Sequence, residues 1–321
     1  MGRVEISDEL VGARVALRYR IGRRDGRPLY SDAVGELSAA GPGAVLVQTR
    51  RGPVHVDRAA VVAVRAVPPA PARRPSLSAI TRLDRLAADA WPAVVDRPLG
   101  AWRLRAAGSY TGRANAGLVL GDPGMPVPAA LDAVRAFAGE HGIPARVHVP
   151  VGSPWDRAVA AQGWVLDVGH AAGAEVAVLV GPLTGTRDPR VQLPERPSDA
   201  WWQLAVGGHP TPAQRHVLDP GGHPRTAFAE IPGPDGAATA QVRATVVEDH
   251  LHLSMLEVEP AARRQGLATA LLASVAEWGQ EHGARWAVLQ VALQNGRARA
   301  LYDHLGYVEH HRYRYLVPPP A

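Results

Sequence analysis

The sequence contains no cysteine and no lysine, and its 321 residues include only two asparagines, Asn115 and Asn295. Without cysteine, the chain can form no disulfide, no thiolate metal site and no covalent intermediate on a thiol. No apolar run approaches the roughly 20 residues that a membrane-spanning helix needs. The N-terminus also lacks the apolar core of a signal peptide. We therefore expect a cytoplasmic protein without membrane contacts.

What is present is enough apolar sequence for sizeable cores, at 46% hydrophobic residues, and a length that suggests two or three domains. The net charge of +5 is uneven, because residues 1–74 hold 13 arginines and 7 acidic residues, whereas the remainder holds 22 and 23. An acidic partner for residues 1–74 is one interpretation. A solvated arginine-rich surface is the favoured one, and a nucleic-acid partner is not expected, because no aromatic residues alternate with the arginines.

Two connectors divide the chain. The first is proline-rich, from Val67 to Pro75, and it follows five short β-type runs that predict a small SH3-like barrel over residues 1–68. The second lies near residues 181–197, where proline, glycine and arginine show no periodicity. It separates two segments of mixed α/β pattern, residues 75–183 and 198–321.

These two segments repeat one another. Phe137-Ala-Gly-Glu-His-Gly142 in the first matches Trp278-Gly-Gln-Glu-His-Gly283 in the second, each at the end of a long predicted helix. A strand and a short helix follow each motif, ending in Gly163-Trp164 or Gly306-Tyr307. We interpret the pattern as a tandem duplication.

A glycine-containing turn in the second copy suits a pyrophosphate. The predicted strand 251–258 leads into Arg263-Arg-Gln-Gly-Leu-Ala-Thr269, which opens the predicted helix 264–281. Gly266 and Ala268 let the backbone approach a ligand, and the unpaired N–H groups of a first helical turn attract anions. Arg263 and Arg264 add positive charge.

Further along, a predicted strand (286–293) precedes the pattern Asn295-x-x-Ala298-x-x-Leu301-Tyr302 and then Gly306-Tyr307. The loop, the strand and this pattern, in that order over about residues 200–317, resemble the GCN5-related N-acetyltransferase superfamily. The resemblance implies an α/β fold, here as tandem copies with the first degenerate, acetyl-CoA as acetyl donor, and a V-shaped gap between two parallel strands.

The resemblance also implies site residues. The N–H groups of Gln265, Gly266, Leu267, Ala268 and Thr269 are expected to bind the pyrophosphate. Backbone groups of Leu256 and Val258 are expected to pair with the pantetheine arm, which Asn295 and Ala298 also approach. The Tyr302 hydroxyl is expected to protonate the departing thiolate, a role that suits a phenol with an ordinary pKa near 10.

The general base is left open. Many members of the superfamily carry a glutamate twelve residues before the tyrosine, but that position here is Gln290. His252, with His250 on the same face of the strand, Glu257 and a water relay are the candidates. His310 and His311 are adjacent, which on a strand points them to opposite faces, so no metal site is predicted.

The first copy lacks the donor-binding parts. Gly152 and Val159 stand where Asn295 and Tyr302 stand in the second copy, and prolines remove N–H donors from the loop. This half is expected to form a wall of the acceptor cleft together with loops that include Trp201-Trp202. For Arg113 and Asn115, packing and acceptor contact are both open.

The leading hypothesis is direct acetyl transfer to the primary amine of a small molecule or amino acid. One alternative is a protein or histone-like lysine acetyltransferase docked through residues 1–74, and another is a non-catalytic protein that senses acetyl-CoA. The absence of lysine means that any lysine acetylation must occur on another molecule.

Overall fold

The computed structural model describes residues 6, 10–41, 43–68, 75–108, 110–222, 224–234 and 236–319. The chain forms two compact units, residues 1–73 and 74–321. Most of the predicted proline-rich connector, residues 69–74, lies outside the described residues. Within the part that is described, no helix combines the length and apolar character needed to cross a bilayer.

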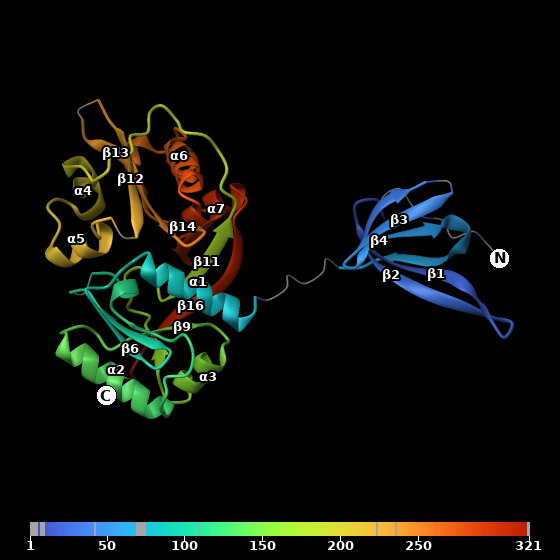
Figure 1. Cartoon of the computed structure of the whole chain (residues 1–321), viewed down its shortest axis with the longest axis horizontal. Coiled ribbons are helices and arrows are strands. Elements are labelled where there is room, and N and C mark those ends of the chain that lie inside the picture. Colours follow the sequence, from blue (N-terminus) through green and yellow to red (C-terminus); the bar gives the residue numbers. More distant parts are fainter. Residues whose placement is uncertain are drawn as a thin grey trace. The chain divides into compact units, whose positions relative to one another are not determined.

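The N-terminal unit, drawn in blue in Figure 1, is all β. It is a single antiparallel sheet of five strands in the order β4-β3-β2-β1-β5. The strands are β1 (Arg14–Arg24), β2 (Arg27–Ala40), β3 (Ala44–Thr49), β4 (Gly52–Asp57) and β5 (Val61–Ala66). Alternate side chains such as Val15, Leu17 and Leu37 are buried in its core. Asp25 and Gly26 form the tight turn of the first hairpin, and both take positive φ (52° and 76°).

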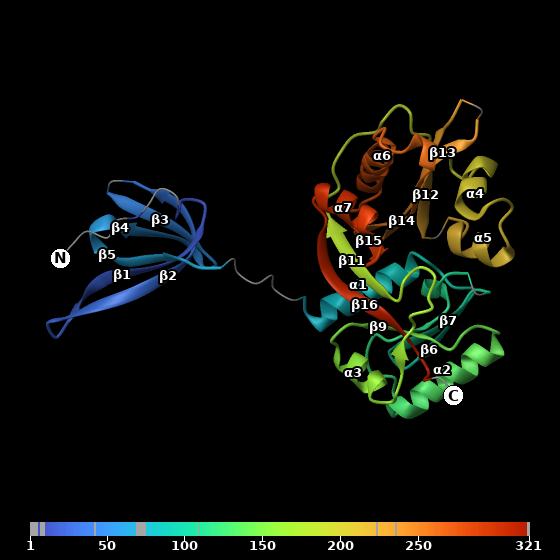
Figure 2. The ribbon, with the colours of Figure 1, turned by 180° about the vertical axis from the view of Figure 1, so that it is seen from behind.

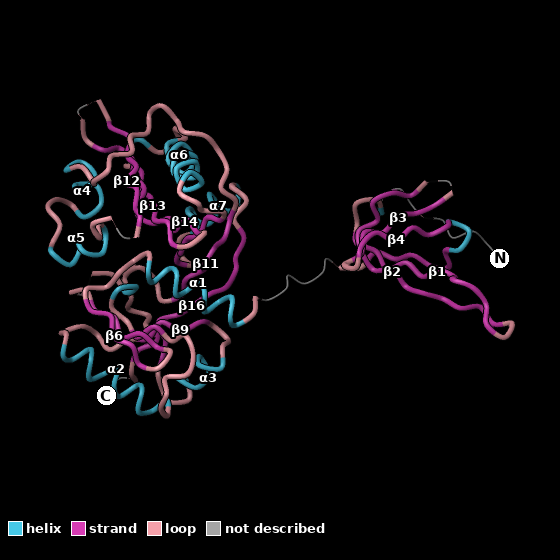
Figure 3. The backbone as a smooth tube through the Cα atoms, in the orientation of Figure 1, coloured by secondary structure: helices cyan, strands magenta, loops and turns pink. Residues whose placement is uncertain are grey.

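The second unit alternates helices and strands around one large sheet (Figure 3). Its first half contains α1 (Leu77–Asp89), β6 (Val95–Leu99), β7 (Trp102–Ala106), β8 (Gly117–Leu118), α2 (Val127–Glu140), β9 (Val147–Pro150), α3 (Pro154–Ala160), β10 (Val165–Leu166) and β11 (Glu175–Gly181). Its second half contains α4 (Asp199–Val206), α5 (Pro212–Leu218), β12 (Arg225–Pro232), β13 (Ala238–Val247), β14 (His250–Val258), α6 (Leu267–Glu281), β15 (Trp286–Ala292), α7 (Gly296–His304) and β16 (Val308–Val317).

The two halves exchange their last strands. The sheet runs β12-β13-β14-β15-β11-β16-β9-β8-β7-β6, with β10 paired to β16. Thus β11, from the first half, pairs with β15 of the second half, and β16, from the second half, pairs with β9 of the first. Figure 2 shows β11 and β16 adjacent at the middle of the unit. The segments predicted as residues 75–183 and 198–321 therefore share one sheet, and the boundary drawn between them stays a prediction.

Similar ring contacts occur at the two matching sequence motifs. The rings of Phe137 and His141, at the end of α2, lie 4.3 Å apart, and those of Trp278 and His282, at the end of α6, lie 4.4 Å apart. Each half has one parallel strand pair, β8 with β9 and β14 with β15. The tandem duplication itself stays a prediction.

Alternate residues of the central strands face different helices. Ala177 and Leu289 pack in the core that contains α6 and α7, whereas Val178 and Val288 pack against α1. Because successive strand residues point to opposite faces, α6 and α1 cover opposite sides of β11 and β15. This division places two sets of functional side chains on the two faces of the sheet.

Candidate active site

A gap opens between two neighbouring parallel strands. The ladder between β14 and β15 runs from His250 and Trp286 to Leu253 and Leu289, where it ends. Both strands continue, β14 to Val258 and β15 to Ala292. The backbone beyond these last paired residues is a free edge that can bind an extended ligand by main-chain hydrogen bonds. The ladder thus ends where the sequence resemblance implied a V-shaped gap.

A bulge in β14 marks the start of the opening. The register of β14 against β13 shifts between Ser254 and Glu257, and Met255 takes a left-handed φ of 54°. Bulges of this kind redirect side chains and are common beside active sites. Here Met255 packs toward Trp91, while Leu256 packs toward α6. At the opening, the bulge therefore directs Met255 and Leu256 to opposite faces of the sheet.

The loop predicted to bind pyrophosphate leads directly into α6. Arg263, Arg264, Gln265 and Gly266 are exposed. Helix α6 begins at Leu267, three residues later than predicted, because Arg264 and Gly266 both adopt left-handed φ values of 65° and 74°. Gly266 is the N-cap and carries no side chain. The N–H groups of the first turn are thus open to an anion at the positive end of the helix dipole.

Two of the residues implied for the donor site have partners within the protein. The Arg263 Nε donates to the carbonyl oxygen of Val258 at 3.0 Å. Asn295 is the N-cap of α7, where its Oδ1 accepts from the Ala298 N–H at 3.1 Å. Arg263 therefore ties the loop to β14, and Asn295 determines where α7 begins.

Helix α7 carries Tyr302 into the core on the α6 face. Its side chain is 7% exposed, and its ring lies 5.5 Å from that of Tyr307. Burial raises the pKa of Tyr302 to about 12. The phenol is therefore protonated throughout the physiological range, as an acid must be before it donates.

The opposite face of the opening is lined by different groups. His252, Ser254 and Gln290 line a small recess there, and His250 lies near His252 on the same face, with 6.3 Å between the ring centroids. Burial, with His250 and Arg243 nearby, lowers the pKa of His252 to about 3. His252 is therefore a neutral and very weak base. Glu257, the other candidate base, is exposed on the free part of β14.

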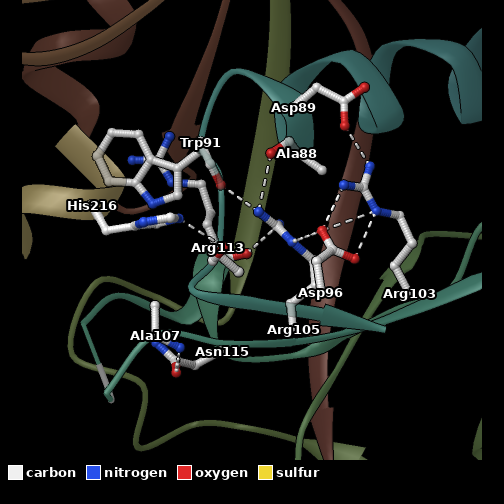
Figure 4. Close-up of polar contacts among 11 residues, drawn as sticks. Ala88, Asp89, Trp91, Asp96, Arg103, Arg105, Ala107, Arg113, Asn115 and His216 are labelled. Atoms are coloured by element: carbon white, nitrogen blue, oxygen red, sulfur yellow. Dashed lines mark hydrogen bonds and ion pairs between the residues drawn. The ribbon is translucent and has the colours of Figure 1, made fainter. Parts of the chain in front are cut away.

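Two buried arginines, Arg105 and Arg243, hold this face together. Arg105 of β7 donates to the carbonyl oxygens of Ala88, Trp91 and Arg113 (Figure 4). Arg243 of β13 donates to the carbonyl oxygens of Ala90, Val217 and Leu218. Burial lowers the pKa of Arg105 to about 10 and that of Arg243 to about 9. Both residues hold the chain segment that follows α1 by hydrogen bonds to its carbonyl oxygens.

A cavity of about 440 Å³ adjoins the recess on the same face. Gln290 and Arg113 line both spaces. The Tyr313 hydroxyl donates to the Gln290 Oε1 at 3.2 Å, and the Arg113 Nη1 donates to the same oxygen at 3.4 Å. The residue that replaces the superfamily's glutamate therefore sits between the recess and the cavity. The volume of the cavity falls within the usual range for small-molecule sites.

Asn115 has a structural role. Its Oδ1 accepts from the Ala107 N–H at 2.8 Å, and its Nδ2 donates to the carbonyl oxygens of Tyr110 and Thr111. These bonds brace the turn that carries Arg113. The tryptophans expected in an acceptor loop, Trp201 and Trp202, are 0% and 4% exposed in a core with Phe228. That expectation was wrong, because α4 packs both rings inward.

The expectation that His310 and His311 point to opposite faces of their strand was also wrong. The pairing of β16 with β11 shifts register between Glu309 and His311, so the two imidazoles meet, with Nδ1 to Nδ1 at 2.8 Å. His311 also contacts the buried carboxylate of Asp84 at 3.2 Å, and His148 approaches it to 3.7 Å. Although burial opposes the effect, both imidazoles lower the pKa of Asp84. The cluster joins α1, β9 and the exchanged strand β16.

Comparisons with known proteins agree with this geometry. A family model described as "Probable histone acetyltransferase Rv0428c C-terminal" matches residues 77–316, and one described as "Rv0428c N-terminal Sm-like domain" matches residues 10–65. The chain is 30% identical over 312 residues to "Probable histone acetyltransferase Rv0428c" of Mycobacterium tuberculosis, covering 95% of both chains. It is 26% identical to "Uncharacterized N-acetyltransferase YobR" of Bacillus subtilis over 245 residues, which cover 73% of this chain and 98% of that protein.

Among solved structures, a "GCN5-related N-acetyltransferase from Kribbella flavida" superposes with a TM-score of 0.53 at 18% identity, covering 78% of this chain and 98% of that one. This likeness concerns the fold. The description of residues 10–65 as Sm-like replaces the SH3-like barrel expected for residues 1–68. Strand and turn patterns could not distinguish the two, because both names describe small β domains with short strands.

Proposed function

Because the chain belongs to the Rv0428c family of GCN5-related N-acetyltransferases, we propose that it transfers acetyl from acetyl-CoA directly to the primary amine of a small molecule or amino acid. The observation that carries this proposal is the opening between β14 and β15 beyond Leu253 and Leu289. On one face of the sheet, the opening is bordered by the N-terminus of α6 and the buried Tyr302. On the other face, it is bordered by the cavity.

The residues present fit acetyl-CoA. The N–H groups from Gln265 to Thr269 are the proposed pyrophosphate site, supported by the bare N-cap at Gly266. The free edge of β14 at Leu256 is proposed to pair with the pantetheine arm. Val258 joins this pairing through its N–H, because Arg263 occupies its carbonyl oxygen. Asn295 and Ala298 fix the start of α7 beside the arm. When bound, acetyl-CoA supplies an acyl group activated as a thioester.

Tyr302 is the proposed general acid. The departing thiolate is basic and needs a proton donor at its side of the sheet. A phenol with a pKa of about 12 holds its proton until such a thiolate forms beside it. Its ring is held in the core on the α6 face.

The acceptor amine is proposed to lose its proton on the face of the sheet opposite to Tyr302. His252 lies there, but a pKa of about 3 makes it a poor acceptor for a proton from an ammonium group. Glu257 is exposed to water on the free part of β14, so it can accept a proton through a water relay. We therefore favour Glu257 with water over His252 as the base.

The mechanism is proposed to use a ternary complex. The chain contains no cysteine that could carry the acetyl group between half-reactions. Donor and acceptor approach from opposite faces of one opening, which allows both to be bound at once. Positioning two reactants together accounts for a large part of the rate enhancement in such reactions.

Residues 75–183 are proposed to be a degenerate copy of the catalytic half. Val159, which stands where Tyr302 stands in the second half, is fully buried in the core. Pro126, which lacks an N–H, caps α2 where Gly266 caps α6. The first half supplies Arg113 and other walls of the cavity instead.

A second candidate function is lysine acetylation of a protein, with residues 1–74 as docking module. The M. tuberculosis relative is named a probable histone acetyltransferase. The excess of arginine in residues 1–74 favours an acidic partner. Removal of residues 1–74 distinguishes the two functions.

Thiol release from acetyl-CoA, measured against a panel of primary amines and amino acids, tests the proposal. We expect turnover with at least one small amine, and the acetylated amine as product by mass spectrometry. Tyr302→Phe is the matched control, because it removes only the hydroxyl. Turnover confined to protein substrates would contradict the leading proposal, and binding of acetyl-CoA without any turnover would contradict both.

A further inference from the structure

Arg113 is the side chain that connects the opening to the cavity. It belongs to a 3-10 turn (Gly112–Ala114) and lines both the recess beside His252 and the cavity of about 440 Å³. Its guanidinium lies 4.4 Å from the centre of the Trp91 ring. Among the ion pairs found in the described residues, none includes Arg113. Its positive charge is therefore available to a ligand.

The turn that carries Arg113 is held from several sides. Arg105 donates to the Arg113 carbonyl oxygen at 2.6 Å. The Trp91 Nε1 donates to the Thr111 Oγ1 at 3.1 Å, and Thr111 is kept at a left-handed φ of 61°. Figure 4 shows Trp91, Arg105 and Arg113 gathered at the end of α1. A cation fixed in this way loses little conformational entropy on binding a ligand.

The cavity as a whole is built for an anion. Its lining includes Arg113, Arg146 and His170, and no aspartate or glutamate is among the described lining residues. Arg146 is already paired with Asp167 at 2.7 Å. That pairing leaves Arg113 as the cation to be neutralised.

We propose that the acetyl acceptor carries a carboxylate a few bonds from its reacting amine, and that Arg113 binds this carboxylate. This inference rests on the proposed function and narrows its substrate class to amino acids and similar compounds. Because Arg113 and Gln290 border both spaces, the carboxylate and the amine lie close together. A carboxylate matches the planar fork of one arginine. A phosphate dianion would keep one charge unpaired.

The test compares amino acids with their carboxamides. Each L-amino acid in a panel is assayed beside its carboxamide, by thiol release, with the wild type and with Arg113→Gln, Arg113→Lys and Arg97→Gln. Arg97 is the matched control, because it is an exposed arginine in an ion pair with Glu140 and does not line the cavity. Phosphoethanolamine represents the amines that carry phosphate.

For the wild type, we expect kcat/KM for the best acid to exceed that for its amide by at least about 30-fold. Arg113→Gln should reduce this ratio to within about 3-fold, Arg113→Lys should be intermediate, and Arg97→Gln should keep the full ratio. Equal use of acid and amide by the wild type, or an equal loss on both in Arg113→Gln, would overturn the inference. So would an Arg113-dependent preference for phosphoethanolamine alone.

Calorimetry with the same acids and amides separates this inference from the proposed function. Binding of acids that depends on Arg113, without turnover of any amine, would support the anion site and contradict the transferase proposal. Turnover of amines without any preference for acids would support the transferase proposal and contradict the anion site. Acetyl-CoA affinity, measured on each variant, should stay within about 3-fold of the wild type, because Arg113 lies on the acceptor face.

Discussion

Replacing Gly266 with aspartate should weaken acetyl-CoA binding without unfolding the protein. Gly266 has a φ of 74°, and a Cβ added there meets nothing within 4 Å. Aspartate and asparagine tolerate this left-handed conformation better than other residues, at a cost of about 1 kcal/mol. A carboxylate at a helix N-terminus returns about 0.3–1 kcal/mol through the helix dipole. We therefore expect little change in the free energy of unfolding.

The effect on the ligand is electrostatic. A carboxylate about 6 Å from a phosphate charge is repelled by about 0.7 kcal/mol in water and about 3 kcal/mol at an effective dielectric constant of 20. The dissociation constant of acetyl-CoA should rise by about 3-fold to about 100-fold. Gly266→Asn has the same shape and backbone preference without the charge, so its affinity should stay near that of the wild type.

Isothermal titration calorimetry with acetyl-CoA measures both variants, and thermal melting checks that both are folded. The difference in acetyl-CoA affinity between Gly266→Asp and Gly266→Asn should become smaller in 1 M salt, because the electrostatic screening length falls from about 10 Å at 0.1 M to about 3 Å. Equal affinity in the two variants at low salt would refute the placement of the pyrophosphate at this loop. Absence of binding in the wild type would refute the donor site altogether.

Three further predictions concern other parts of the molecule. Tyr302→Phe should lower kcat by about 10²-fold or more while acetyl-CoA affinity changes little; with a pKa of about 12, Tyr302 should cause no alkaline loss of activity below about pH 10, and an alkaline limb near pH 8 that vanishes in the variant would contradict this. The pKa of His252 in the folded state is about 3, below its usual value, so the free energy of unfolding should fall as pH drops from about 6.5 to about 3. His252→Phe should remove roughly 3 kcal/mol of the difference in unfolding free energy between pH 7 and pH 4, measured by urea denaturation. The same pH dependence of stability in the wild type and the variant would count against this prediction. Deletion of residues 1–74 should leave kcat/KM on small amines unchanged, whereas selective loss of activity on protein substrates would favour the docking function.

The local parts of the candidate site could be predicted from the sequence. The Gly266 turn, the helix that follows it and the spacing from Asn295 to Tyr302 each depend on residues close together in the chain. Helix α6 was still expected to begin too early, because the left-handed φ of Arg264 cannot be recognised from residue type. The face shared by His250 and His252 followed from strand alternation alone.

The contacts around the proposed acceptor cavity could not be predicted in this way. Arg105 and Arg243 lie on β7 and β13, yet both bind carbonyl oxygens at the end of α1. His310 and His311 meet because of a bulge against β11, a strand of the other half. Arg243 and Ala90 are 153 residues apart, and His311 pairs with Val178 of the other half. Residue patterns carry no record of such distant partners. Even the contact of Arg105 with Ala88, over 17 residues, depends on how β7 packs against α1.

The sequence by itself excluded a cysteine thiol as an acetyl carrier. It also predicted a donor site, from a glycine turn suited to a pyrophosphate and from a tyrosine at a set distance after an asparagine. The tertiary structure decided how the two halves cooperate. By exchanging β11 and β16, the fold places Arg113 of the first half beside Gln290 of the second. Short-range preferences specify turns and helix ends, whereas the burial of a shared sheet selects which distant residues meet.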